Sequence, residues 1–185
     1  AAHLLGAKVY LLDMNLERLR YLSDVMPPNC FALMSAPATI RELIQKADVV
    51  VGAVLRPGAK APRLITREML KTMKEGAVLV DVAIDQGGCF ETSRATTHKD
   101  PIYAVDGVIH YCVANMPGAL PKTSTLALTN ATLPYALEIS NKGWKKALRE
   151  NPEIKFGTNV VKGHVTHQGV ADAFHLGYMP VENLL

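Results

Sequence analysis

Short apolar runs alternate along the first part of the chain with segments whose apolar residues recur at helical spacing. The main runs cover 8–13, 48–54 and 77–84, and shorter ones cover 103–105 and 108–113. These runs are rich in β-branched residues, which is typical of strands buried on both faces of a sheet. The helical segments between them predict an α/β fold with a parallel, doubly wound (Rossmann-like) sheet.

Capping residues mark the helices that separate these runs. Residues 1–5 are predicted to be the end of a helix, because Gly6 tolerates the left-handed torsions that stop one. Asn15 and Thr66 each precede an apolar helical pattern and are the expected N-caps. The predicted helices lie at 16–22, 39–47 and 67–74.

The pattern changes after Pro121. Residues 124–149 form one long helical pattern, with a kink expected at Pro134 because proline removes a helical hydrogen-bond donor. The remaining tail has little periodicity apart from a short helix expected at 170–176. We therefore expect an α/β domain followed by a helical segment that belongs largely to a second domain, with bounds at 1–120 and 121–185.

Composition narrows the class of protein. The 185 residues include 20 Lys and Arg against 17 Asp and Glu, and this net charge of +3 is scattered, which argues against a nucleic-acid partner. No apolar run approaches the roughly 18 residues of a membrane span, so no membrane partner is expected. Three cysteines are too few for a disulfide scaffold and favour a reducing, cytoplasmic location.

The first apolar run ends in an acid, Asp13. In a dinucleotide-binding βαβ unit, the acid that ends the second strand accepts the ribose hydroxyls about 20 residues after a glycine-rich turn. Counting back from Asp13 leads beyond Ala1, so we expect this domain to lack its first strand and its glycine-rich loop. The alternative is a plain strand with a solvated terminal Asp.

Ligands of open parallel sheets bind beyond the carboxyl ends of the strands. Four loops fall there, at 13–15, 55–62, 85–89 and 114–121. Asp85 directly follows a buried run and precedes two glycines that allow a ligand to approach the backbone. Asn115 and Met116 offer an amide and a flexible apolar side chain, a suitable floor for a flat aromatic ring. A purely structural loop is the alternative at Asp85.

Other candidate chemistries are weaker. Residue types that ligate metals occur at Cys89, His98, His110 and Cys112. They lack the spacing of a zinc site, so no metal is predicted. A nucleophilic Cys89 would require a base and a lowered pKa, and we expect a buried, inert thiol instead. Glu138 and Lys142, four residues apart, are expected to form a surface ion pair.

Four stretches of the sequence resemble the alanine dehydrogenase family. The two longest are DVAIDQGGCFETSRATTH, from Asp81 to His98, and YCVANMPGALPKTSTLALTNATLPY, from Tyr111 to Tyr135; the others are LLDMNLERL (11–19) and GAVLRPGAKAPRLIT (52–66). The nucleotide-binding subunit of proton-translocating transhydrogenase is more distantly similar. Arg56 and Ala95 stand where the family usually has an aliphatic residue and a proline.

The resemblance implies an enzyme that uses NAD to interconvert L-alanine with pyruvate and ammonia by hydride transfer, working as a homo-oligomer, a hexamer in the family. It implies that Asp13 holds the adenosine ribose. Other implied cofactor contacts are Arg18 and Ser35 near the adenosine, Val54 and Leu55 in the cleft, and Val82, Ala83, Ile84, Asp85, Arg94, Val113, Ala114, Asn115 and Met116 around the nicotinamide and its ribose. Asp85 is the implied catalytic acid.

The family also uses a His, a Lys and an Arg from an amino-terminal half that this chain does not contain. The 185 residues alone are therefore expected to be inactive, and residues 121–185 would return to the substrate domain. Two other classes of protein stay open. One is a non-catalytic nucleotide-binding or assembly module that exists in this form, and the other is a transhydrogenase-type NAD(H)-binding subunit.

Overall fold

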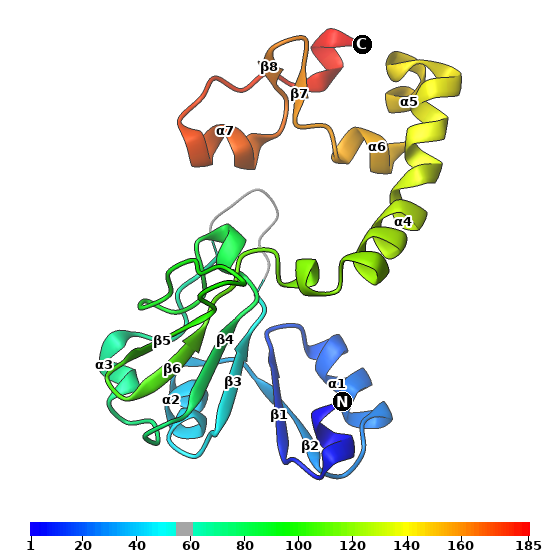
Figure 1. Ribbon diagram of the computed structural model, residues 1–185. Helices are drawn as coiled ribbons and strands as arrows, with labels where there is room; N and C mark the ends of the chain where they lie inside the picture. The colour runs from blue at the N-terminus through cyan, green and yellow to red at the C-terminus, as the bar shows by residue number, and fades with distance from the viewer. Residues whose placement is uncertain (55–60) are drawn as a thin grey trace.

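A computed structural model describes residues 1–54 and 61–185 (Figure 1). In these ranges the strands form three sheets, with orders β1-β2, β3-β4-β6-β5 and β7-β8. The strands are β1 (Val9–Asp13), β2 (Cys30–Met34), β3 (Val49–Gly52), β4 (Val78–Asp81), β5 (Ile102–Val105), β6 (Val108–Tyr111), β7 (Val160–Val161) and β8 (His164–Val165).

Most strand pairs of the α/β part are parallel, as the alternating pattern predicts. β1 pairs with β2, β3 with β4, and β4 with β6 in parallel. β5 is the exception, because it runs antiparallel to β6. Only Asp106 and Gly107 join these two strands, and both have positive φ angles, 50° and 79°. Two such residues make a tight hairpin turn, which forces neighbouring strands to run in opposite directions.

The single sheet expected from the sequence is divided in two. Among the described strands, no ladder joins the β1–β2 pair to the four-stranded sheet, although Leu12 of β1 packs against the core beneath that sheet. A doubly wound sheet with strand order 3-2-1-4-5-6 has its first strand between these two groups. The expected lack of that first strand stays a prediction.

The predicted caps of the first helices are confirmed. The Asn15 side chain accepts a hydrogen bond from Arg18 N at 3.1 Å, and the Thr66 side chain accepts one from Met69 N at 3.4 Å. Gly6 ends a short 3₁₀-helix with a φ of 86°. The helices of this part are η1 (Ala2–Leu5), α1 (Leu16–Val25), α2 (Pro37–Ile44), α3 (Arg67–Leu70), η2 (Ile84–Gln86) and η3 (Met116–Ala119).

Helix α3 is shorter than the predicted 67–74. After Leu70 the backbone bonds tighten, since Thr72 N donates to Met69 O and Met73 N donates to Leu70 O. The Thr72 hydroxyl also donates to Met69 O at 2.8 Å. A threonine that bonds to a nearby carbonyl in this way competes with the regular helical ladder, which ends the helix early.

The long helix predicted at 124–149 is two helices. α4 (Pro121–Lys142) contains Pro134, and α5 (Trp144–Glu150) follows Gly143, whose φ of 74° and ψ of 151° lie outside the helical range. The predicted Glu138–Lys142 ion pair is confirmed at 2.8 Å. The tail adds α6 (Pro152–Phe156), α7 (Gln168–Phe174), where a helix at 170–176 was predicted, and η4 (Val181–Leu184).

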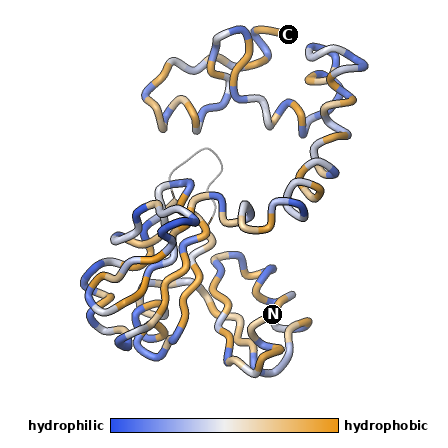
Figure 2. Tube along the Cα trace, viewed as in Figure 1, coloured by the Kyte–Doolittle hydropathy of each residue, from blue (hydrophilic) through white to orange (hydrophobic). Residues whose placement is uncertain are grey.

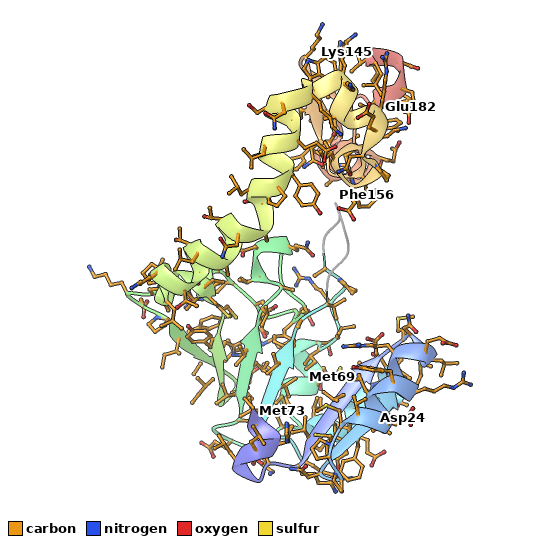
Figure 3. All side chains as sticks on the ribbon, turned by 90° about the vertical axis from the view of Figure 1, so that its right-hand side faces the viewer. Asp24, Met69, Met73, Lys145, Phe156 and Glu182 are labelled. Atoms are coloured by element: carbon orange, nitrogen blue, oxygen red, sulfur yellow. The ribbon has the colours of Figure 1, made fainter. Side chains whose placement is uncertain are left out.

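Two separate apolar clusters hold the described residues together. The larger lies between the four-stranded sheet and its helices, and includes Ile44, Ile65, Leu70, Leu79 and Phe90; the strands of this sheet are largely apolar in Figure 2. The smaller joins α5, α6 and η4. Figure 3 labels Met69 and Met73, which pack against the first cluster, and Lys145, Phe156 and Glu182 at the opposite end of the molecule.

Helix α4 connects these two ends (Figure 1) and has no buried residue. Its exposed apolar side chains include Leu126, Leu128, Leu133 and Leu137. No helix in the described ranges, α4 included, is long and apolar enough to cross a membrane.

Candidate cofactor site

The candidate residues follow the carboxyl ends of parallel strands. Gly52, the last residue of β3, pairs with Asp81, the last residue of β4. Val82 continues this ladder by one bond, because its N–H donates to the Gly52 carbonyl at 2.8 Å. Parallel neighbours end at the same edge of a sheet, so the loops after β3, β4 and β6 emerge together there.

Asp13 and Ser35 lie side by side at the end of the β1–β2 pair. Ser35 N donates to the Asp13 carbonyl at 2.9 Å, and Asn15 N donates to Asp13 Oδ1 at 2.9 Å. The Asp13 side chain is exposed, and Arg18 is exposed in the first turn of α1. The structure therefore brings Asp13, Ser35 and the start of α1 to one edge, with a carboxylate facing solvent.

The loop after β4 carries Asp85 on the single turn η2. Asp85 is exposed, and the Val82 side chain is 50% exposed. Ala83 and Ile84 are only 8% and 7% exposed, because their side chains face the protein interior. A ligand at this loop can therefore touch the side chains of Val82 and Asp85, but it can reach the other two chiefly through their backbone.

A buried polar cluster lies beneath this loop. It consists of Asp81, Cys89, Ser93 and Cys112, which are linked by side-chain hydrogen bonds. Burial raises the pKa of the Cys89 thiol to about 11, and burial also raises the pKa of Cys112. Both thiols therefore stay protonated at neutral pH, which is the inert behaviour expected of Cys89 and the opposite of an activated nucleophile.

The segment after β6 forms the next part of the edge. Val113 is fully buried, and Ala114 N donates to the Thr96 carbonyl at 3.1 Å. Asn115 is exposed with a left-handed φ of 55°, and His98 Nε2 lies 3.0 Å from its carbonyl oxygen. Half-buried Met116 then begins η3. Asn115 and Met116 thus emerge from a fixed backbone next to the loop that carries Asp85.

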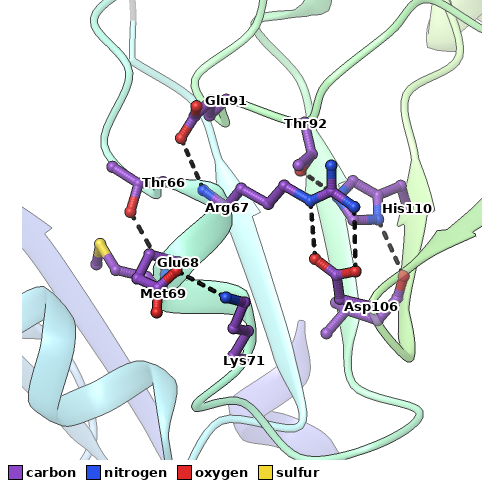
Figure 4. Close-up of polar contacts among 10 residues, drawn as sticks. Thr66, Arg67, Glu68, Met69, Lys71, Glu91, Thr92, Asp106 and His110 are labelled. Carbon is purple, nitrogen blue, oxygen red and sulfur yellow. Dashed lines mark hydrogen bonds and ion pairs between the residues drawn. The ribbon is translucent and has the colours of Figure 1, made fainter.

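Arg94 and His110 lie on the flank of this site. The Arg94 guanidinium lies 4.0 Å from the centre of the Tyr103 ring. His110 is fully buried and stacks on Tyr103. Its Nε2 lies 2.7 Å from Thr92 Oγ1, a hydrogen bond that Figure 4 marks. Burial lowers the pKa of His110. The same figure shows Arg67 pairing with Asp106, which ties α3 to the β5–β6 turn.

The candidate residues after β3 are Val54 and Leu55. Val54 is half-buried and packs against the larger apolar cluster, whereas Leu55 lies outside the described residues. In the described ranges, no group of three or more His, Cys, Asp or Glu side chains could hold a metal ion.

Sequence reasoning missed Asp81 and Ser93 as parts of the site. Both are quoted in the family motif, but the residues singled out from that stretch were Val82 to Asp85 and Arg94. Asp81 lies inside the apolar run at 77–84, so the sequence does not mark it as the last residue of a strand, whereas Asp13 ends its run; only the structure ends β4 at Asp81. Cys89 and Ser93 also fold back over Asp81, and no periodicity in the sequence indicates that contact.

Together, the fold and the site define an α/β protein with mostly parallel strands, most of whose candidate binding residues lie at or directly after the carboxyl ends of strands. The chain belongs to the alanine dehydrogenase/PNT family: residues 1–168 match the model described as "Alanine dehydrogenase/PNT, C-terminal domain". The resemblance stated from the sequence motifs is therefore confirmed.

Individual relatives agree with the family match. The chain is 54% identical over 182 residues to alanine dehydrogenase 2 of Staphylococcus aureus strain USA300, and equally to that of strain NCTC 8325, covering 98% of this chain and 49% of each relative. A solved L-alanine dehydrogenase structure superposes with a TM-score of 0.81 at 44% identity, over 94% of this chain and 48% of that one. A transhydrogenase from Sinorhizobium meliloti gives 0.67 at 29% identity, over 90% and 44%. The chain thus spans about half the length of these relatives.

Proposed function

We propose that this chain is the NAD-binding half of an L-alanine dehydrogenase, an enzyme that reversibly converts L-alanine to pyruvate and ammonia with NAD. The observation that carries the proposal is the 54% identity to alanine dehydrogenase 2, which extends over 98% of the chain and therefore includes every candidate residue. The polypeptide that carries it would include an amino-terminal half that supplies the substrate-binding groups.

The residues at the carboxyl edge fit an NAD molecule. Exposed Asp13 ends a parallel strand, where a carboxylate accepts the ribose hydroxyls of a dinucleotide. Ser35, beside it, and Arg18 are proposed near the adenosine. Half-exposed Val82 and half-buried Met116 would give the nicotinamide ring an apolar surface.

For the remaining candidate residues, the burial of the side chain decides which atoms can contact the cofactor. Because Ala83, Ile84 and Val113 are buried, we propose that they contribute backbone atoms, as does Ala114 at the end of its ladder. Val54 and Leu55 would line the cleft after β3, and Arg94 would lie near the nicotinamide ribose. These assignments follow the family motifs residue by residue.

The residues of the site would contribute in two ways: they would position the reactants, and they would stabilise the charge of the substrate amine. Bound NAD would supply the hydride acceptor. Asp85, exposed and ionisable, would orient the positively charged amine of the substrate and stabilise the cationic species formed from it. Asn115 would hydrogen-bond an amide or a carboxylate with its two donors and its acceptor. The apolar surfaces of Val82 and Met116 would help to exclude water from the reacting atoms.

The proposal also accounts for the divided sheet and for α4. A strand from the preceding half would lie between β1 and β3 and complete one doubly wound sheet over residues 1–120. Residues 121–185 would pack largely on the substrate domain, and the exposed leucines of α4 would be covered by that domain or by other subunits of a homo-oligomer. The three free cysteines are compatible with a cytoplasmic enzyme.

The test compares two purified proteins in the same assay. The full-length polypeptide that carries this chain should oxidise NADH when pyruvate and ammonia are supplied, and it should reduce NAD when L-alanine is supplied. The 185 residues alone should do neither. A full-length protein that binds NAD but turns over no alanine would contradict the proposal and favour a non-catalytic nucleotide-binding module. Hydride exchange between NADH and an NADP analogue would favour a transhydrogenase-type subunit, which the lower TM-score makes second choice.

A further inference from the structure

Asp81 is an acid that the proposed chemistry does not use. It is the last residue of β4 and its side chain is 0% exposed. A carboxylate this deep in the protein is tolerated only when hydrogen bonds replace its lost water. Asp81 has four: it accepts from Ala83 N at 3.1 Å, Cys89 N at 2.8 Å, Ser93 Oγ at 2.5 Å and Cys89 Sγ at 3.4 Å.

These donors come from both sides of Asp85. Ala83 precedes η2, whereas Cys89 and Ser93 follow it. One buried carboxylate therefore holds the start and the return of the loop to the end of the same strand. The loop is closed further by Gly88 N, which donates to the Ala83 carbonyl at 3.1 Å, and by Ala61 N, which donates to the Gln86 carbonyl at 3.0 Å.

The backbone packs closely around Asp81 and its donors at two glycines, Gly88 and Gly52. A Cβ atom built on Gly88 would lie 2.7 Å from Asp81 Oδ2 and 2.7 Å from the Ser93 Cβ. A Cβ atom built on Gly52, the ladder partner of Asp81, would lie 2.9 Å from Cys89 Sγ. A Cβ at Gly88 would thus collide with the carboxylate itself, and a Cβ at Gly52 would collide with the Phe90 ring and with the Cys89 sulfur, which donates to that carboxylate.

We propose that Asp81 is a positioning residue for the reaction: its carboxylate fixes the loop on which Asp85 meets the substrate. This inference rests on the function proposed above. Asp81 touches neither substrate nor cofactor in this role. It acts by replacing a flexible loop with one geometry, so its effect should fall more strongly on the rate of the chemical step than on the binding of NAD, which also depends on Asp13 and Ser35 at the β1–β2 edge.

The test is Asp81→Asn in the full-length protein. The amide keeps the shape but presents a donor where the loop requires an acceptor, so the loop around Asp85 should change its position. Because small misplacements of reacting groups are costly, kcat should fall on the order of tenfold to a hundredfold. The Kd for NAD, measured by calorimetry, should change by a smaller factor than kcat, because Asp13 and Ser35 would bind the cofactor away from this loop. Asp48→Asn is the matched control, because it makes the same change at the exposed amino end of the four-stranded sheet and should leave kcat unchanged.

A second variant separates positioning from folding. Ser93→Ala leaves the carboxylate intact and removes one of its donors, so it should lower kcat less than Asp81→Asn, again with a smaller change in the Kd for NAD than in kcat. If both variants keep the wild-type kcat and lose only thermal stability, Asp81 is a purely structural acid and the inference is wrong. If the wild-type protein itself turns over no alanine, the proposed function fails and this inference fails with it.

Discussion

The hydroxyl of Tyr103 holds the backbone of Arg94 while its ring supports the Arg94 guanidinium. Arg94 N donates to the Tyr103 hydroxyl at 2.8 Å, and the hydroxyl donates to the Thr92 carbonyl at 2.8 Å. The guanidinium lies 4.0 Å from the centre of the same ring. One side chain from β5 thus fixes both the main chain and the side chain of a candidate cofactor residue.

Tyr103→Phe is expected to release the Arg94 backbone and keep the ring. The variant loses one accepted and one donated hydrogen bond, which should lower the free energy of unfolding by about 1–3 kcal/mol. Urea titration of the full-length protein measures this change. Tyr21→Phe is the control, because the Tyr21 ring lies beneath Arg18 on exposed α1 and should be insensitive to loss of the hydroxyl. Equal stability of Tyr103→Phe and wild type would contradict the role of the hydroxyl.

Asp13 should set the choice between NAD and NADP. Its exposed carboxylate would repel the 2′-phosphate of NADP, so the full-length protein should bind NAD more tightly. Asp13→Ala should narrow the difference between the two Kd values, measured by calorimetry. Asp13→Asn keeps an acceptor for Asn15 N and separates loss of charge from loss of this turn. Equal binding of both cofactors by the wild type would refute the assignment.

Gly87 and Gly88 offer a matched pair of substitutions. Their φ angles are 90° and 82°, so alanine at either position is strained by about 1–2 kcal/mol. At Gly87 a Cβ would meet nothing within 4 Å, whereas at Gly88 it would collide with Asp81 and Ser93. Gly88→Ala should therefore lower the free energy of unfolding clearly more than Gly87→Ala in urea titrations. Equal losses of unfolding free energy in the two variants would contradict this prediction and show that the loop over Asp81 can shift to accommodate a Cβ atom at Gly88.

His110 should make stability depend on pH in the acid range. Burial holds its pKa below the ordinary 6.5, so below that pH the unfolded chain binds a proton that the folded protein resists. The free energy of unfolding should then fall as the pH falls below about 6.5, by at most about 1.4 kcal/mol per pH unit. His110→Gln should remove this contribution. Parallel stability curves of the two proteins between neutral and mildly acid pH would contradict the assignment.

Helix caps and short apolar runs predicted much of the fold, because each depends on interactions among residues that are close in the sequence. Asn15 and Thr66 cap helices wherever a helix follows, and buried β-branched runs become strands in most contexts. The sequence analysis did not predict β2, although its apolar run CFALM lies between Pro28 and Pro37. This run is longer than the run at 103–105 that was predicted to be a strand, so the local signal for β2 was present in the sequence and was missed.

Long-range contacts account for what the sequence could not predict. Gly143 divides the long helix because its φ and ψ angles lie outside the helical range. The helical spacing of apolar residues continues across Gly143, so the sequence pattern does not indicate the break. The same holds for the candidate site, where some features could be predicted from the sequence and others could not. Asp13, Asp85 and Asn115 could be placed after strands by counting, but the burial of Ala83 and Ile84 and the four bonds to Asp81 depend on how the chain folds back from Ser93.

Helix α4 has a consequence for how this sequence can vary. Exposed apolar side chains that recur along a helix are typical of a surface that another element covers, and α4 carries exposed leucines at 126, 128, 133 and 137 with no buried residue among the described ones. The exposed leucine positions of α4 should therefore tolerate replacement as poorly as buried core positions do. Mutational scanning of the complete protein should find Leu→Asp changes along α4 as harmful as the same change at Leu79, the fully buried leucine of β4.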